Sequence, residues 1–211
     1  MYIAFEGVIG VGKTTLARLL QSSFQADLLL EIFEENPFLS DFYSDRKRYA
    51  FQTQIFFLLS RYHQQRKGVR DALANNPWLI SDYTFQKDRL FAEVNLDGDE
   101  LEMYFRVHEA LAEKITPPDL IVYLRADTDV LMQRIAQRDR PYERQMEVGY
   151  IDTLNNTYEH HFGNRSEKNI LVINTNDLNY VRDSQDLEYV EQRIRQAMKL
   201  SPFQESLPID L

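Results

Sequence analysis

The residues with the clearest chemical potential form a glycine-rich octet near the N-terminus, Gly7-Val8-Ile9-Gly10-Val11-Gly12-Lys13-Thr14. An apolar run precedes it and a helical pattern follows it, which is the context of a phosphate-binding loop. Its glycines let the backbone turn tightly and direct successive N–H groups at phosphate oxygens. We expect Lys13 to reach the β- and γ-phosphates and Thr14 to ligate Mg²⁺. The predicted nucleotide-binding residues here are Gly7, Gly10, Val11, Gly12, Lys13, Thr14 and Thr15.

Two carboxylates follow apolar runs elsewhere in the chain. Glu31 follows three leucines, and Asp82 follows Leu79-Ile80-Ser81. In an α/β fold the carboxyl ends of the strands form the ligand-binding edge of the sheet. Glu31 is therefore a candidate to accept the proton of an attacking hydroxyl group. Asp82 is a candidate to act on Mg²⁺, directly or through water, although capping the next turn is the alternative role.

Four arginines gather in the segment QRIAQRDRPYER, at positions 134, 138, 140 and 144. Arg134 and Arg138 are four residues apart and share a helical face. Guanidinium groups around a proline-containing turn suit a lid that closes over a transferring phosphoryl group. The alternative is an ordinary solvated face, in which Asp139 and Glu143 pair with the arginines.

Other classes of phosphate-loop protein have less support. A GTPase should carry an Asn-Lys-x-Asp motif after a late strand, but the nearest segment, 174–177, reads Asn-Thr-Asn-Asp and lacks the lysine. Motor ATPases need a larger domain and a paired Asp-Glu after a strand, whereas Asp82 stands alone. The arginine cluster together with the loop favours a small-molecule kinase over a switch.

These residues need a sheet to position them, and the hydrophobic pattern supplies one. Apolar runs alternate with helical patterns, which indicates an α/β fold with a parallel sheet. We predict a P-loop kinase fold with a five-stranded parallel sheet flanked by helices, as one domain over residues 1–200, followed by an extended tail at 201–211. The predicted strands are Tyr2–Phe5, Asp27–Leu30, Trp78–Ser81, Leu120–Leu124 and Ile170–Ile173. The predicted helices are Lys13–Ser23, Lys47–Arg66, Glu100–Lys114, Asp129–Arg138, Glu147–Phe162 and Asp186–Leu200.

Composition narrows the partners. The net charge of −9 argues against binding a nucleic-acid polymer, which needs a basic surface. The absence of cysteine excludes disulfides and thiolate catalysis. No apolar run approaches the ~18 residues of a membrane span, and no signal peptide pattern opens the sequence. We therefore expect a cytoplasmic protein with no membrane partner.

Five segments carry a family resemblance, in the family's order. The sequence resembles the deoxynucleoside kinases, and most the bacterial deoxyguanosine and deoxyadenosine kinases, from Tyr2 to about Phe162. The segments are FEGVIGVGKTTLA, EIFEENPFLSDFY, YAFQTQIFFLLSRY, ISDYTFQKDRLFA and QRDRPYERQMEVGYIDTL.

The resemblance implies roles for individual residues. Glu31 corresponds to the catalytic base that takes the proton of the 5′-hydroxyl group. Gln54 corresponds to the glutamine that reads the base edge, with Gln52 as the alternative if the register is two residues out. Arg61 and Asp88 correspond to an arginine–aspartate pair found near the base. A glutamine amide offers both a donor and an acceptor, which suits an adenine or cytosine edge.

Further roles follow from the same resemblance. Tyr43 corresponds to the tyrosine that contacts the sugar 3′-hydroxyl group, and Phe91 to a ring that packs on the base. Arg134, Arg138 and Arg140 correspond to lid arginines around ATP.

The sequence departs from the wider family in several places, one of which is the spacing from Asp82 to Phe91, one residue shorter than in the deoxycytidine enzyme. Many members have an acidic residue, arginine and serine after the third strand, whereas this chain reads Asp82-Tyr83-Thr84. Tyr83 cannot supply the arginine's charge, so we expect another residue, such as Arg138, to do so. Where others place a sugar-contacting glutamate before a tyrosine, this chain has Gly149, and Glu147 is the predicted substitute.

Taken together, the sequence predicts an ATP- and Mg²⁺-dependent kinase acting on the 5′-hydroxyl of a deoxynucleoside, a purine by resemblance, in nucleotide salvage. Lys13, Glu31 and Arg138 are the predicted catalytic residues. The alternatives are a nucleoside monophosphate kinase of the thymidylate type, which needs a basic group for the acceptor phosphate, and a non-catalytic nucleotide-binding module. The resemblance also implies a homodimer, with the helices Glu100–Lys114 and Glu147–Phe162 as the candidate interface.

Overall fold

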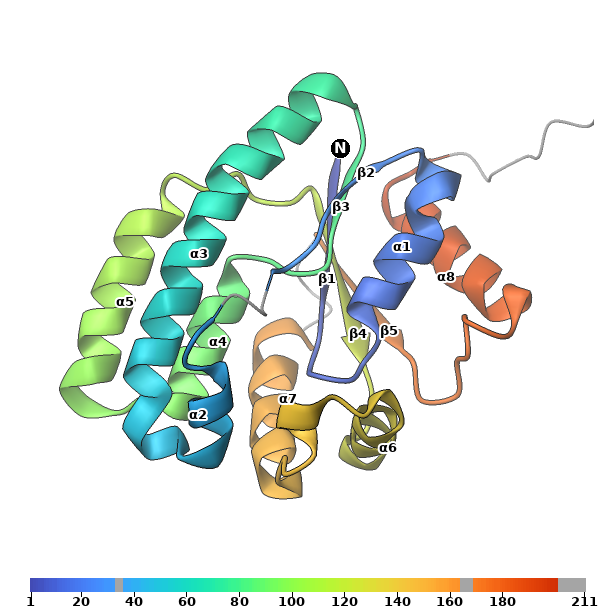
Figure 1. The fold of residues 1–211 in the computed structure, drawn as a ribbon. Helices are drawn as coiled ribbons and strands as arrows, with labels where there is room; N and C mark the ends of the chain where they lie inside the picture. The colour runs from blue at the N-terminus through green and yellow to red at the C-terminus, as the bar shows by residue number, and fades with distance from the viewer. Residues whose placement is uncertain (33–35, 164–168, 201–211) are drawn as a thin grey trace, which may run out of the picture.

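A single five-stranded parallel sheet forms the centre of the computed structural model, which describes residues 1–32, 36–163 and 169–200 (Figure 1). The strand order is β2-β3-β1-β4-β5, which confirms the predicted sheet. The predicted tail at 201–211 lies outside the described residues. The strands are β1 (Tyr2–Glu6), β2 (Asp27–Leu29), β3 (Leu79–Ser81), β4 (Leu120–Arg125) and β5 (Ile170–Asn174).

Strand β1 lies in the middle of the sheet and is buried along its whole length. A central parallel strand is covered on both faces, so it reads as a continuous apolar run rather than as an alternating one. Its register places Ala4 beside Ser81 of β3 and Ile121 of β4. Parallel pairing brings the carboxyl ends of β1 and β3 to the same edge, where the phosphate loop and Asp82 begin.

Helices cover both faces of the sheet (Figure 1). Helices α3, α4 and α5 lie together on one side, α1 and α8 lie on the other, and α6 and α7 lie toward the carboxyl ends of the strands. The helices are α1 (Lys13–Phe24), α2 (Leu39–Ser44), α3 (Arg46–Asn75), α4 (Gln86–Asn95), α5 (Gly98–Ala112), α6 (Thr128–Arg138), α7 (Val148–Phe162) and α8 (Ser184–Ala197). A short 3₁₀ turn, η1 (Pro141–Glu143), connects α6 to α7.

Helix α3 is longer than its predicted span of Lys47–Arg66. Asp45 caps its N-terminus by accepting a hydrogen bond from the Arg48 backbone N–H, and the helix continues to Asn75. It stops shortly before Pro77, which cannot donate a backbone hydrogen bond. At Gly68 the helix packs closely on β2, since a Cβ there would overlap the Leu29 side chain.

Two helices, α2 and α4, were not predicted. Helix α2 is only six residues long, too short to show a hydrophobic period. In α4 the buried residues include Lys87 and Asp88, which interrupt the apolar pattern expected of an inward face. Both helices contribute to the cavity described below, so the omissions fall at the candidate site.

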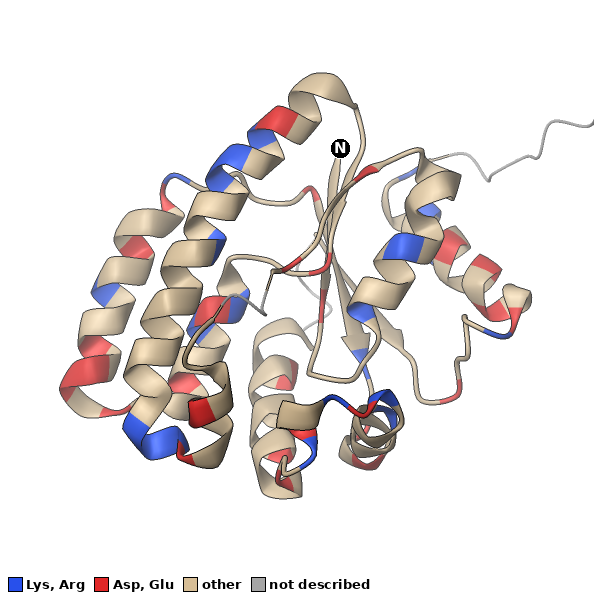
Figure 2. Cartoon of the chain, in the orientation of Figure 1, with Lys and Arg blue, Asp and Glu red and all other residues tan. Residues whose placement is uncertain are grey.

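Charge is distributed over both sides of the molecule. Figure 2 shows acidic and basic positions interspersed along the helices, and both signs meeting in the connection between α6 and α7. Within the described ranges, no helix combines the length and the apolar character needed to cross a membrane.

Candidate active site

The phosphate loop connects β1 to α1 and has the backbone geometry that the glycines permit. Gly10 and Gly12 have φ values of +89° and +103°, a region that other residues rarely adopt. Helix α1 begins at Lys13, so its positive N-terminal end faces the loop. The Val11 carbonyl accepts hydrogen bonds from the Tyr180 hydroxyl, at 3.1 Å, and from Arg134 Nη1, at 3.4 Å. Because that carbonyl is held, the peptide joining Val11 to Gly12 has a fixed orientation.

Gly7 and Lys13 shape the loop in different ways. Gly7 lies against β4, where a Cβ would overlap the Leu124 carbonyl oxygen, so this glycine allows close packing; it lines neither of the two cavities described below. Lys13 Nζ donates to the carbonyls of Gly7 and Val8, at 2.6 and 3.1 Å. Burial, followed by the nearby charge of Lys87, lowers the pKa of Lys13 to about 8.

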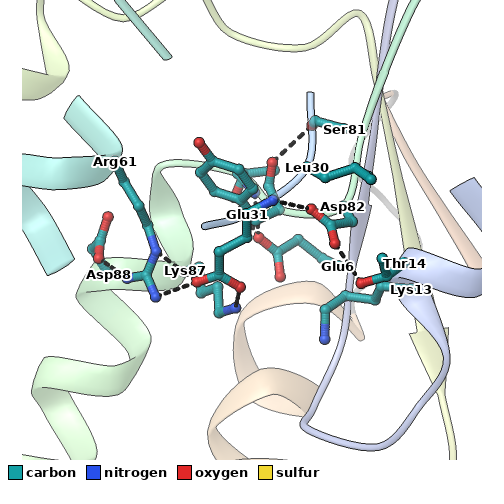
Figure 3. A network of polar contacts seen from close by, with 12 residues as sticks. Glu6, Lys13, Thr14, Leu30, Glu31, Arg61, Ser81, Asp82, Lys87 and Asp88 are labelled. Carbon is teal, nitrogen blue, oxygen red and sulfur yellow. Dashed lines mark hydrogen bonds and ion pairs between the residues drawn. The ribbon is translucent and has the colours of Figure 1, made fainter. Parts of the chain in front are cut away.

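Asp82 links the phosphate loop to the segment that carries Glu31 (Figure 3). It follows β3 directly, and its Oδ2 accepts a hydrogen bond from the Thr14 hydroxyl group. Its Oδ1 accepts one from the backbone N–H of Glu31, at 2.8 Å. One carboxylate therefore fixes the spacing between the first turn of α1 and Glu31.

Glu31 is held by two cations. Arg61 donates from Nε and Nη2 to Glu31 Oε1, at 2.9 and 2.5 Å, and Lys87 Nζ donates to Oε2, at 2.5 Å (Figure 3). Burial alone would raise the pKa of the Glu31 carboxyl, but the charges of Lys87 and Arg61 outweigh it and hold that pKa well below its usual range. Glu31 is therefore ionised at neutral pH.

Asp88 pairs with Arg61 through a different guanidinium nitrogen from those that contact Glu31. It is fully buried, and its Oδ1 accepts a hydrogen bond from Arg61 Nη1. Burial raises the pKa of Asp88 to about 6, although the charge of Arg61 lowers it. Asp88 does not line the cavity, so the predicted pair reaches a ligand only through its arginine.

These groups border a cavity of about 270 Å³ at the carboxyl edge of the sheet. Its polar residues include Lys13, Thr14, Thr15, Glu31, Tyr43, Thr53, Gln54, Arg61, Asp82, Lys87, Arg138 and Arg140. Phe57 and Phe91 contribute aromatic rings, and the Arg61 guanidinium lies 4.4 Å from the Phe57 ring centroid. Tyr43 stacks on Tyr142 of the 3₁₀ turn, with centroids 5.9 Å apart. The structure thus gathers most of the predicted substrate residues in one place.

Two polar side chains on α3 face this cavity with unsatisfied atoms. Gln54 and Thr53 are buried and line the cavity. Gln54 Oε1 and Thr53 Oγ1 have no hydrogen-bond partner among residues 1–32, 36–163 and 169–200. A buried acceptor without a partner costs roughly 1–3 kcal/mol, so both positions favour a polar ligand that donates hydrogen bonds. Gln54, Leu58 and Arg61 lie on one face of α3, and all three are buried.

The arginines after α6 have partners within the protein. Arg138 forms a two-bond pair with the buried Glu143, with Nη2 at 2.7 Å from both carboxylate oxygens, and Arg140 lies 3.6 Å from the same carboxylate. Both arginines line the cavity. Arg144 instead pairs with Asp139 at an exposed position.

Arg134 faces away from this cavity. It donates to the Thr175 carbonyl, at 2.5 Å, and to Val11, so it ties the phosphate loop to the segment after β5. A second cavity, of about 530 Å³, lies there; it shares Gly10, Gly12, Thr15 and Arg138 with the first.

Glu147 lies outside both cavities. Its side chain is 71% exposed and pairs with Arg46 at 2.5 Å, on the outer surface between α3 and α7. The structure therefore does not bring Glu147 to the residues that would contact a sugar, although the sequence singled it out for that role.

Lys87 is a charged residue of the cavity that was not predicted from the sequence, and Thr53 is a polar one. Lys87 is buried, lines the cavity and contacts Glu31 directly. A signal was available, because Lys87 precedes Phe91 by four residues and so shares its helical face. Its Nζ lies 5.6 Å from the centroid of the Phe91 ring.

Thr14 and Asp82 are the residues whose side-chain oxygens fit Mg²⁺. They are hydrogen-bonded to each other beside the phosphate loop, and hard oxygen donors are what this ion prefers. Across the part of the chain that the structure describes, no group of three His, Cys, Asp or Glu side chains could hold a metal on its own. This donor set suits an ion completed by substrate phosphates and water.

Comparison with known proteins identifies the family of the chain. A model of the deoxynucleoside kinase family matches residues 3–199. The chain is 33% identical to the deoxyguanosine kinase of Bacillus subtilis (strain 168) over 199 residues, covering 92% of this chain and 96% of that protein. It is also 33% identical to the deoxyadenosine kinase of Dictyostelium discoideum over 189 residues, with 87% and 75% covered.

Solved structures show the same fold. Deoxyadenosine kinase from M. mycoides with bound dCTP superimposes with a TM-score of 0.78, at 27% identity over 93% of this chain and all of that one. The same enzyme with bound dATP also gives a TM-score of 0.78, at 25% identity over 92% of this chain and 99% of that one. The predicted resemblance and enzyme class are confirmed. The chain belongs to the deoxynucleoside kinase family and is a phosphotransferase.

Proposed function

We propose that this kinase transfers the γ-phosphoryl group of ATP to the 5′-hydroxyl group of a purine deoxynucleoside. The observation that carries the proposal is the Asp82 bridge, which holds the ionised Glu31 beside the first turn of α1. A carboxylate at that point can orient a hydroxyl group toward a phosphate bound in the loop. The purine preference is supported by the relatives, which are named as deoxyguanosine and deoxyadenosine kinases.

In phosphoryl transfer the protein mainly positions the two substrates and stabilises the negative charge on the phosphoryl group. Phosphoryl transfer passes through a loose transition state, so a strong base is not required. A carboxylate has about four lone-pair sites, and donors from Arg61 and Lys87 use three of them on Glu31. The remaining site can accept the hydrogen bond of the 5′-hydroxyl group. The low pKa of Glu31 keeps it an acceptor until the proton becomes acidic in the transition state.

Recognition of the base falls to α3. Both Gln54, which supplies a donor and an acceptor, and Arg61, which supplies donors, line the cavity from this helix. Phe57 and Phe91 offer aromatic surfaces on which a base can pack. The unsatisfied Gln54 Oε1 favours a base edge that carries an amino group.

The donor nucleotide would occupy the phosphate loop and the second cavity. We propose that Lys13 contacts its β- and γ-phosphates, and that Thr14 and Asp82 hold Mg²⁺, which neutralises phosphate charge when bound. Arg138 and Arg140 would act as the arginine-rich lid, exchanging Glu143 for phosphate oxygens. Arg134 would fix the loop rather than bind phosphate directly.

A panel assay tests the proposal. The purified chain is incubated with ATP and Mg²⁺ and with each deoxynucleoside or deoxynucleoside monophosphate in turn, and products are identified by mass spectrometry. We expect 5′-monophosphates of deoxyadenosine or deoxyguanosine to form fastest. Transfer to monophosphates alone would instead support a thymidylate-type kinase, and ATP binding without any transfer would support a non-catalytic module.

We also propose that the kinase works as a cytoplasmic homodimer in nucleotide salvage. An exposed apolar side chain on α5, Met103, is available for an interface of the kind the sequence suggested. Light scattering after size exclusion at several protein concentrations measures the mass directly, and a mass near 25.0 kDa throughout would contradict the dimer.

A further inference from the structure

Lys87 is a buried lysine in direct contact with the proposed base, Glu31. It is the second residue of α4, its side chain is only 9% exposed, and it lines the cavity beside Glu31. Burying an ammonium group is costly, and a purely structural site usually surrounds it with several acceptors. Among the described residues, Glu31 Oε2 is the one hydrogen-bond partner of Lys87 Nζ. An ammonium group has three N–H donors, so the remaining donors can serve a ligand.

The position expected to supply a cation near the acceptor does not do so. Tyr83 follows Asp82, but it is fully buried and its hydroxyl group donates to Gln64 Oε1 at 2.6 Å. Tyr83 does not line the cavity. Arg138, the substitute suggested by the sequence, is occupied by Glu143. Lys87 is the cation in contact with the free side of Glu31, opposite Arg61.

Lys87 and Lys13 approach the same place from two elements. Figure 3 shows Glu31 and Lys87 on one side, Lys13 on the other, and Glu6 between them. The buried Glu6 accepts hydrogen bonds from Thr84 at 2.7 Å and senses the charges of both lysines. Burial raises the pKa of Glu6, whereas Lys87 and Lys13 oppose that rise. The two ammonium groups therefore flank the point where phosphate and hydroxyl would meet.

We propose that Lys87 is a catalytic residue, which donates hydrogen bonds to the 5′-oxygen and to an equatorial oxygen of the transferring phosphoryl group. This inference rests on the proposed function. In the step, the bond from the 5′-oxygen to the γ-phosphorus forms and the bond from that phosphorus to the β,γ-bridging oxygen breaks. The hydroxyl proton passes to Glu31, ADP leaves with the bond electrons, and Lys87 keeps its proton throughout. Its charge stabilises the negative charge that spreads over the equatorial oxygens.

The kinetic test compares Lys87→Met with Lys87→Arg, and with Arg89→Met as the matched control. Arg89 lies on the same helix but pairs with Glu93 away from the cavity. Removing one preorganised donor from a transition state costs about 100- to 1,000-fold in kcat, so Lys87→Met should lose that much. We expect KM for ATP to stay within about threefold, because ground-state binding uses the loop. Lys87→Arg should recover at least about tenfold of the lost kcat, since it restores the charge.

The split between kcat and ATP binding separates a catalytic role from a structural one. A structural defect at Lys87 would lower kcat and weaken ATP binding together, whereas the loss of a donor used only in the transition state lowers kcat and leaves ATP binding unchanged.

The activity of Lys87→Met decides whether Lys87 is catalytic. If Lys87→Met keeps kcat within about threefold of the unaltered chain, or if kcat and ATP binding fall together, the catalytic role is wrong. If Lys87→Met does not fold, Lys87→Gln replaces it, because the amide keeps a donor to Glu31 without the charge and the same loss is expected. An unaltered chain that phosphorylates no deoxynucleoside overturns the proposed function and this inference together, whereas an active chain with a fully active Lys87→Met overturns this inference alone.

Discussion

The two halves of the site are built in opposite ways. The phosphate loop takes its groups from one continuous stretch, and its main contributors are backbone N–H groups and the first turn of α1. The acceptor side takes Glu31 from the segment after β2, Arg61 from α3, and Lys87 and Asp88 from α4, and its contributors are charged side chains. A local motif can preserve the first, whereas only the complete fold assembles the second.

Their electrostatics differ as well. On the acceptor side, ion pairs neutralise buried charge, and the pKa values of Glu31 and Asp88 move in opposite directions. On the donor side, the hydrogen bonds of Lys13 Nζ within the described part of the chain go to neutral carbonyls, and burial lowers the pKa of this lysine. A cation held without a direct anionic contact is prepared to bind an anion, whereas a neutralised cluster is prepared to bind a nearly neutral nucleoside. Asp82 connects the two halves, because it accepts hydrogen bonds from Thr14 and from the Glu31 backbone.

The largest effect should come from the donor half. Lys13→Met removes the charge that faces phosphate and should lower kcat/KM by about 1,000-fold, with weakened ATP binding but unchanged deoxynucleoside binding. Initial rates and titration calorimetry with each ligand separately measure this. Lys67→Met, at an exposed position on α3, is the matched control. An equal loss of deoxynucleoside binding would contradict the idea that the two halves of the site bind their ligands independently.

The acceptor half has a distinctive stability signature. Asp88 has a folded pKa of about 6, above its unfolded value of 3.8, so the folded chain binds the extra proton first. Its contribution to stability is fully present below pH 3.8 and is lost as the pH rises through 6. As the pH falls from 6 to 4, Asp88 protonation therefore opposes acid unfolding, by up to about 1.4 kcal/mol per pH unit.

Asp88→Asn removes this opposition. The free energy of unfolding, measured by urea titration across that pH range, should fall more steeply with acid in Asp88→Asn than in the unaltered chain. Asp99→Asn, on the exposed first turn of α5, should leave the slope unchanged. Parallel curves for Asp88→Asn and the unaltered chain would mean that Asp88 is not the group that gains the proton.

The smallest effect concerns the rim of the acceptor half. Glu147 pairs with Arg46 in solvent, so Glu147→Gln should change kcat/KM for a deoxynucleoside by less than about twofold. Steady-state kinetics on deoxyadenosine and deoxyguanosine measure it. A larger rise in KM for the deoxynucleoside would contradict this expectation. It would mean that Glu147 contacts the sugar, as the sequence suggested, and that the acceptor half includes the start of α7.

This difference also explains what the sequence could predict. The strands, the loop and Lys13 are encoded by local patterns, as are the carboxylates that directly follow a strand, so these were found from spacing alone. Glu147 was placed by position along the chain, and the fold turned that position outward. Lys87 was not predicted because charged residues on the buried face of α4 do not follow the usual apolar pattern. A buried lysine is recognisable only when its partner is known, and Glu31 is far from Lys87 in the sequence. Arg134 was assigned to phosphate, although its described hydrogen bonds are to the protein itself.

The most direct test of the two-part site is Glu31→Gln, measured for both ATP binding and phosphoryl transfer. The amide keeps the size of the side chain but cannot take the 5′-hydroxyl proton. Acid–base groups contribute about 100- to 10,000-fold, so we expect kcat to fall by that much while the Kd for ATP changes by less than about twofold. Near-normal turnover would contradict the role of Glu31, and a parallel loss of ATP binding would contradict the independence of the phosphate loop.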